Sequence, residues 1–127
     1  MKQIPFFNYP ALFARDEPEL IPIIHDVLRR GAYIMQKDLL QFEENLGSYL
    51  SVKHVIGVAD GTIALMMGLR AAGIGNGDEV IVPSHTFVAS AAAIYHVGAQ
   101  PVLADCDADH LMDSADVARK MIEDEFS

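Results

Sequence analysis

Two short stretches of this sequence carry residue types that could bind a small ligand. In the first, Asp60-Gly61-Thr62 separates an apolar run at residues 54–59 from a helical pattern that begins at Thr62. Free backbone N–H groups and the dipole at a helix start attract phosphate. Gly61 would let a phosphate approach the backbone, and Thr62 adds a hydroxyl. The alternative is that Asp60 caps the helix, a common role for aspartate.

The second stretch, residues 83–87, reads Pro-Ser-His-Thr-Phe and follows an apolar run at residues 79–82. It places an aromatic ring and two hydroxyls after a predicted strand, where a flat cofactor could stack on Phe87. The alternative is that Phe87 begins the apolar face of the next helix and that His85 lies on the surface. Together the two stretches would supply a phosphate-binding loop and a stacking surface, as a phosphorylated heteroaromatic cofactor requires.

The elements that would position these stretches alternate between strand and helix. Apolar residues at helical spacing predict amphipathic helices at residues 17–30, ended by Gly31, and at 37–50. The remaining patterns predict buried strands at 54–59, 79–82 and 100–104, and helices at 62–72, 88–97 and 114–126. This order is typical of an α/β fold with a mostly parallel sheet and flanking helices, and we expect the sheet to be incomplete within this chain. Ligands of such sheets bind at the carboxyl ends of the strands, where both stretches fall.

Composition and charge exclude several classes of function. The chain has 127 residues, with 9 Lys+Arg against 18 Asp+Glu and a formal net charge of −9. An acidic surface repels nucleic-acid phosphates and anionic lipid head groups, so we expect neither nucleic acid nor a membrane as a partner. The single cysteine, Cys106, cannot form an intramolecular disulfide, and the amino-terminal residues lead into no apolar signal core. We therefore expect a cytoplasmic protein.

Five ordered blocks of the sequence carry a resemblance to a known family. They are GAYI at residues 31–34, FE at 42–43, DGTIAL at 60–65, GIGNGDEVIVPSHTF at 73–87 and GAQPVLAD at 98–105. In order and spacing they resemble the start of the DegT-type sugar-nucleotide aminotransferases, which are fold-type I enzymes that use pyridoxal 5′-phosphate (PLP). The resemblance implies the opening portion of the large domain of such an enzyme. It would comprise an N-terminal helical segment at residues 1–50, packing on the large domain, and the start of the PLP-binding domain at 51–127.

The same resemblance implies a function and a set of binding residues. The implied reaction transfers an amino group from glutamate to a keto sugar nucleotide, in a homodimer with active sites at the subunit boundary. Gly61 and Thr62 match the positions that hold the cofactor phosphate, and Phe87 matches the position that stacks on the pyridine ring. Two positions depart from the family pattern: Asp60 stands where Ser or Asn is common, and Gln36 stands where a glycine is expected.

PLP chemistry also needs groups that this chain does not offer at a suitable place. A lysine must hold the cofactor covalently and move a proton, and an acid must keep the pyridine nitrogen protonated. The lysines are Lys2, Lys37, Lys53 and Lys120, and none falls in a loop at the carboxyl end of a predicted strand. In the family both groups lie beyond the segment seen here. We therefore expect this chain to supply no catalytic residue and to be inactive alone.

Two alternatives remain open on the sequence: a non-catalytic dimerisation or regulatory remnant of this fold, and a PLP-dependent sugar dehydratase relative with His in place of the catalytic Lys.

The spacing of the aspartates near the end of the chain gives a weaker signal, for a metal site. Five aspartates from Asp105 to Asp116 have the spacing of a calcium-binding loop, but His110 occupies the position that requires glycine. We therefore predict a solvated acidic turn and no metal site.

Overall fold

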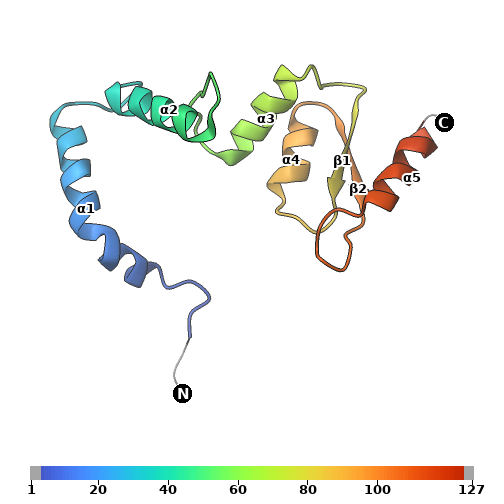
Figure 1. The fold of residues 1–127 in the computed structure, drawn as a ribbon, viewed down its shortest axis with the longest axis horizontal. Helices are drawn as coiled ribbons and strands as arrows, with labels where there is room; N and C mark the ends of the chain where they lie inside the picture. The colour runs from blue at the N-terminus through green and yellow to red at the C-terminus, as the bar shows by residue number, and fades with distance from the viewer. Residues whose placement is uncertain (1–3, 125–127) are drawn as a thin grey trace. The chain divides into compact units, whose positions relative to one another are not determined.

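The computed structural model describes residues 4–124, and these residues form two compact units that divide between Gly57 and Val58. The first unit contains the helices α1 (Tyr9–Arg29) and α2 (Lys37–Leu50). The second contains α3 (Gly61–Ala71), β1 (Glu79–Pro83), α4 (Ala89–His96), β2 (Gln100–Ala104) and α5 (Ser114–Asp124) (Figure 1). No helix within residues 4–124 is both long enough and apolar enough to cross a membrane.

Helix α1 begins eight residues earlier than the apolar pattern predicts, at Tyr9 instead of Glu17. Its N-cap is Asn8, whose side chain accepts a hydrogen bond from the Ala11 N–H at 3.3 Å. Pro10 lies in the first turn, where a missing N–H costs no helical hydrogen bond. At the other end Gly31 adopts a φ of +65°, the left-handed conformation that commonly follows a helix. The predicted stop at Gly31 is therefore confirmed.

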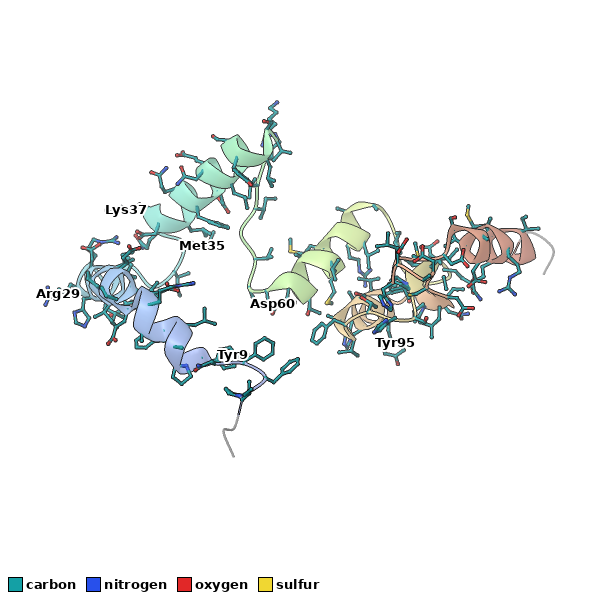
Figure 2. The ribbon with its side chains drawn as sticks, turned by 60° about the horizontal axis from the view of Figure 1, so that its bottom comes forward. Tyr9, Arg29, Met35, Lys37, Asp60 and Tyr95 are labelled. Carbon is teal, nitrogen blue, oxygen red and sulfur yellow. The ribbon has the colours of Figure 1, made fainter. Side chains whose placement is uncertain are left out.

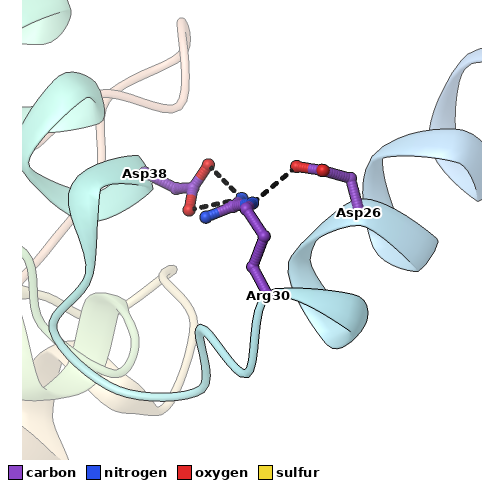
Figure 3. Close-up of polar contacts among 3 residues, drawn as sticks. All are labelled: Asp26, Arg30 and Asp38. Atoms are coloured by element: carbon purple, nitrogen blue, oxygen red, sulfur yellow. Dashed lines mark hydrogen bonds and ion pairs between the residues drawn. The ribbon is translucent and has the colours of Figure 1, made fainter.

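The first unit is held mainly by polar contacts. The Arg30 guanidinium donates from Nε to Asp26 at 2.7 Å and from Nη2 to both carboxylate oxygens of Asp38 at 3.0 and 3.1 Å (Figure 3). This hydrogen bonding holds the pKa of Asp38 below its usual value and raises that of Arg30. No residue of α1 or α2 is buried within the described part of the chain. The apolar faces of both helices are consequently largely exposed, with only partial cover of Ile21, Val27, Leu39 and Leu46.

The prediction of a buried strand at residues 54–59 is wrong. These residues have no strand assignment, and the Ile56 side chain is 72% exposed. The Gly57 N–H donates to the Glu43 carboxylate at 2.7 Å instead of to a neighbouring strand. An apolar, β-branched run favours extended backbone, but a strand also needs a partner, and the sheet within residues 4–124 consists of β1 and β2.

In the second unit, β1 and β2 pair in parallel, with Glu79 opposite Gln100 and Pro83 opposite Ala104. The Ser84 N–H donates to the Ala104 carbonyl at 2.8 Å, which extends the pairing just past the strands. Helix α4 connects the two strands and packs on both of them, and α3 packs on α4. The predicted α/β class with parallel strands is therefore confirmed.

The core of the chain lies between this sheet and the two helices. Its buried apolar residues are Val82, Ile94, Val97 and Ala99, each at most 5% exposed. Partly buried side chains from α3 and β1, including Met66, Leu69 and Val80, pack against them. The turn between α4 and β2 favours glycine, because Gly98 has a φ of +91°, and a Cβ there would also meet the side chain of Asn76.

Helix α5 is attached to β2 through a buried carboxylate. Asp116, 6% exposed, accepts the Asp105 N–H at 2.8 Å and pairs with Arg119 and with the Lys120 ammonium, the latter at 4.0 Å. The Asp105 N–H and then the two cations lower the pKa of Asp116, against the opposing effect of burial. The helix predicted at 114–126 is found from Ser114 to Asp124, and the last two predicted residues lie outside the described range.

Candidate functional site

The start of α3 contains the helix cap that the sequence offered as one alternative. Asp60 is extended, with a φ of −162°, and its Oδ1 accepts the Ile63 N–H at 2.9 Å. This contact turns the Asp60 carboxylate onto the third residue of the helix (Figure 2 labels Asp60 at this end). Asp60 therefore satisfies one of the unpaired N–H groups that every helix start presents.

The Asp60 cap leaves the donor groups of the next two residues, Gly61 and Thr62, available to an anion. Within residues 4–124, the backbone N–H groups of Gly61 and Thr62 and the Thr62 hydroxyl have no hydrogen-bond acceptor or partner. A Cβ placed on Gly61 would meet no atom within 4 Å, so the space in front of its backbone is open. Two adjacent free N–H groups at a helix N-terminus, with a hydroxyl beside them, match the donors that a phosphate needs. Capping and anion binding are thus compatible here.

Phe87 lies in the loop between β1 and α4, and its side chain is 76% exposed. It lies before α4 and outside the core of residues 4–124, so it does not begin a buried apolar face of that helix. His85 is exposed, as the alternative interpretation expected. The loop is closed by the Ser90 N–H donating to the Phe87 carbonyl at 3.0 Å and by a hydrogen bond between the Thr86 and Ser90 hydroxyls at 3.2 Å. An exposed phenyl ring on a closed loop can stack on a flat ligand.

The structure brings the three predicted binding residues to one end of the second unit. Helices α3 and α4 pack together and run in a similar direction, so their N-termini lie at the end where β1 finishes (Figure 1). Gly61 and Thr62 begin α3, and Phe87 precedes α4 by two residues. The loop after β2 reaches the same end, because the His110 ring contacts the His85 ring with centroids 5.7 Å apart.

Sequence reasoning missed the role of His110 in this arrangement. In the sequence, His110 stands out only as the residue that breaks a calcium-loop pattern, and nothing in the spacing links it to His85. Three aspartates of that pattern accept backbone N–H groups instead: Asp107 accepts from Asp109 and Leu111, Asp113 accepts from Ala115, and Asp116 accepts from Asp105. Within the described residues, no three His, Cys, Asp or Glu side chains are grouped to hold a metal ion.

The described lysines offer no obvious covalent attachment point for a cofactor. In the second unit, the Lys120 ammonium lies beside the buried Asp116 carboxylate. Lys37 and Lys53 are exposed in the first unit, and Lys2 lies outside the described residues. The expectation that this chain supplies no catalytic lysine stays a prediction.

The fold and the site together define a class of protein. A parallel α/β unit has an exposed helix N-terminus and an aromatic ring at the carboxyl end of its sheet, which is where such folds bind phosphorylated ligands. The model of the DegT/DnrJ/EryC1/StrS aminotransferase family matches residues 15–125, and the chain belongs to this family. The resemblance found in the five sequence blocks is therefore confirmed.

Individual relatives agree with this membership. The chain is 40% identical over 108 residues to dTDP-3-amino-3,4,6-trideoxy-alpha-D-glucose transaminase of Streptomyces venezuelae, covering 85% of this chain and 28% of that protein. It is similar in structure to S. venezuelae DesV, solved in complex with a ketimine intermediate, with a TM-score of 0.85, 38% identity, and coverage of 94% of this chain and 32% of that one. The PLP form of a putative sugar aminotransferase, Spr1654 from Streptococcus pneumoniae, gives a TM-score of 0.73 and 36% identity, covering 78% and 26% of the two chains. This chain thus spans about 30% of the length of the relatives it matches.

Proposed function

We propose that this chain provides the cofactor-phosphate part of a PLP-dependent aminotransferase that aminates keto sugar nucleotides. The observation that carries the proposal is the pair of free N–H groups at Gly61 and Thr62, at the start of α3 in a member of a sugar aminotransferase family. When bound, PLP supplies an electron sink that stabilises negative charge on a substrate carbon. The chain's own residues bind and orient that cofactor.

In this proposal each binding residue has a separate task. The Gly61 and Thr62 N–H groups and the Thr62 hydroxyl donate to the phosphate, while Asp60 stays turned away on the Ile63 N–H. The exposed ring of Phe87 stacks on the flat face of the cofactor and excludes water from it. Residues 51–127 would form the start of the PLP-binding domain, and residues 1–50 a helical segment that packs on the large domain.

The proposed partners follow from the family. The acceptor is a keto sugar nucleotide, the amino donor is glutamate, and the product is an amino sugar of the kind used in polysaccharides or antibiotics. The complete enzyme would be a homodimer, and the exposed apolar faces of α1 and α2 are suited to burial against another surface. A single, unpaired cysteine supports a cytoplasmic location.

Thr62→Ala tests the proposed phosphate contact. Loss of one charge-assisted hydrogen bond is worth about 1.5–3 kcal/mol, so the dissociation constant for PLP should rise roughly tenfold to 150-fold. Equilibrium dialysis measures this constant, and Thr62→Ser is the matched control that keeps the hydroxyl. An unchanged constant for Thr62→Ala, with the circular dichroism spectrum intact, would remove Thr62 from the site.

A further inference from the structure

The loops that follow β1 and β2 meet through two histidine rings. His85 belongs to the first loop and His110 to the second, and both residues are exposed. Their ring centroids are 5.7 Å apart and their planes are inclined at 80°. This edge-to-face geometry is a favourable arrangement for two aromatic rings. The contact joins residues that are distant in sequence, at the end of the unit where Phe87 lies.

The second loop holds His110 in place through its own hydrogen bonds. The Asp107 carboxylate accepts the N–H groups of Asp109 and Leu111 at 2.9 and 3.0 Å, and the His110 N–H donates to the Asp107 carbonyl at 3.1 Å. His110 has a φ of +63°, a left-handed conformation that glycine adopts most easily and that histidine and asparagine adopt more often than most other residues. Glycine would form this turn with less strain, so what His110 adds is its ring.

The first loop is anchored at its two ends, and between them the Thr86 hydroxyl bonds to the Ser90 hydroxyl of α4 at 3.2 Å. At its start the Ser84 N–H donates to the Ala104 carbonyl at 2.8 Å, and at its end the Ser90 N–H donates to the Phe87 carbonyl at 3.0 Å. Within residues 4–124, the His85 ring makes the one polar or aromatic contact that ties residues 85–87 to another loop. Besides the Thr86–Ser90 bond to α4, the path of the backbone into Phe87 therefore depends on that ring contact.

We propose that His110 is a positioning residue that acts through His85 to fix the loop presenting Phe87. The hydrogen-bonded turn of the second loop fixes the His110 ring. Contact with that ring restrains His85 and the first loop, which keeps the exposed Phe87 ring in position for a flat ligand. The identity of that ligand rests on the proposed function, whereas the mechanical role of His110 does not. The assignment of the ligand and the positioning role of His110 can therefore be tested and rejected independently.

The test measures backbone ¹⁵N order parameters of residues 85–87 by NMR, on the 127-residue chain without ligand. In the wild-type chain we expect values of about 0.85, as in rigid backbone, and in His110→Asn values below about 0.6. Asparagine tolerates the left-handed conformation and so keeps the turn while removing the ring. His85→Phe keeps a ring at the contact and should retain the wild-type values.

A further variant controls for any effect of His110→Asn on the structure of the second loop. His85→Asn leaves residues 105–113 unchanged in sequence, and it should loosen residues 85–87 as much as His110→Asn does. Order parameters that stay at the wild-type level in both asparagine variants would overturn the proposal, and so would equal loosening by His85→Phe. Adding PLP to the same samples and recording the Phe87 resonances tests the proposed function separately. If Phe87 resonances do not respond to PLP while loop dynamics follow the expected pattern, the positioning role stands and the cofactor assignment fails.

Discussion

The two units of this chain are held together in different ways. The second unit has a core in which Val82, Ile94 and Val97 are nearly inaccessible to water. The first unit has no buried residue in either helix, and its clearest internal ties are the Arg30 ion pairs and the Glu43 hydrogen bond to Gly57. Apolar burial is the dominant stabilising term in folding, and exposed ion pairs contribute little.

This difference teaches which part of the chain can carry a binding site by itself. A site needs a support that does not move, and the core beneath α3 and α4 supplies one for Gly61, Thr62 and Phe87. The helices of the first unit have amphipathic patterns without a covered face, so their stability depends on a surface that buries them.

The largest expected effect comes from truncating the core of the second unit. The Ile94 side chain is 3% exposed. Ile94→Ala should lower the unfolding free energy of the chain by about 2–5 kcal/mol, because it removes buried apolar surface and leaves a cavity. The matched change in the first unit is Ile24→Ala on α1, where the side chain is 47% exposed and the cost should stay within about 0.5 kcal/mol. Urea denaturation of both variants measures the two values. Equal losses would contradict the contrast between the units.

A second prediction concerns the buried carboxylate that attaches α5. Because the pKa of Asp116 is lowered in the folded chain, its stabilising contribution is present above the unfolded pKa of about 3.9 and is lost as pH falls through the folded value. Asp116→Asn should therefore destabilise the chain at pH 7, and the difference from wild type should disappear in strong acid. Thermal melts of the wild-type chain and of Asp116→Asn across pH 2–7 measure this stability difference. A difference that stays constant with pH would exclude the ionic role of Asp116.

Local patterns predicted much of the fold, and contacts between distant segments account for what they missed. The bounds of α2 and β2 match the sequence prediction, because helical periodicity and short apolar runs are local signals. The strand expected at residues 54–59 failed because extended propensity does not provide a hydrogen-bonding neighbour. The first turns of α1 were missed because Asn8 and Pro10 precede the apolar repeat.

The candidate site shows the same division between local and distant information. The sequence located Gly61, Thr62 and Phe87 in loops after apolar runs, but it offered two interpretations of Asp60 and of Phe87. The cap on Ile63 and the exposure of the Phe87 ring depend on backbone geometry that periodicity does not report. The contact between His85 and His110 depends on the relative course of two loops, and no spacing rule predicts it.

The smallest expected effect comes from the ion pairs of the first unit. Arg30 bonds to carboxylates whose side chains are 63% and 50% exposed, so solvent and salt screen the attraction. Arg30→Gln should slightly reduce helical content at low salt, and about 1 M sodium chloride should abolish the difference from wild type. Circular dichroism at 222 nm in both buffers measures this. A large loss that persists in high salt would mean that Arg30 stabilises the unit by packing.

The most direct test of the central claim maps where the cofactor phosphate binds. Amide NMR spectra of the chain are recorded during titration with PLP, with inorganic phosphate and with pyridoxal, which lacks the phosphate. We expect PLP and inorganic phosphate to shift the Gly61 and Thr62 amide resonances, since those N–H groups are free to donate, and pyridoxal to leave them unchanged. Phosphate-dependent shifts confined to other residues, with Gly61 and Thr62 unmoved, would contradict the central claim.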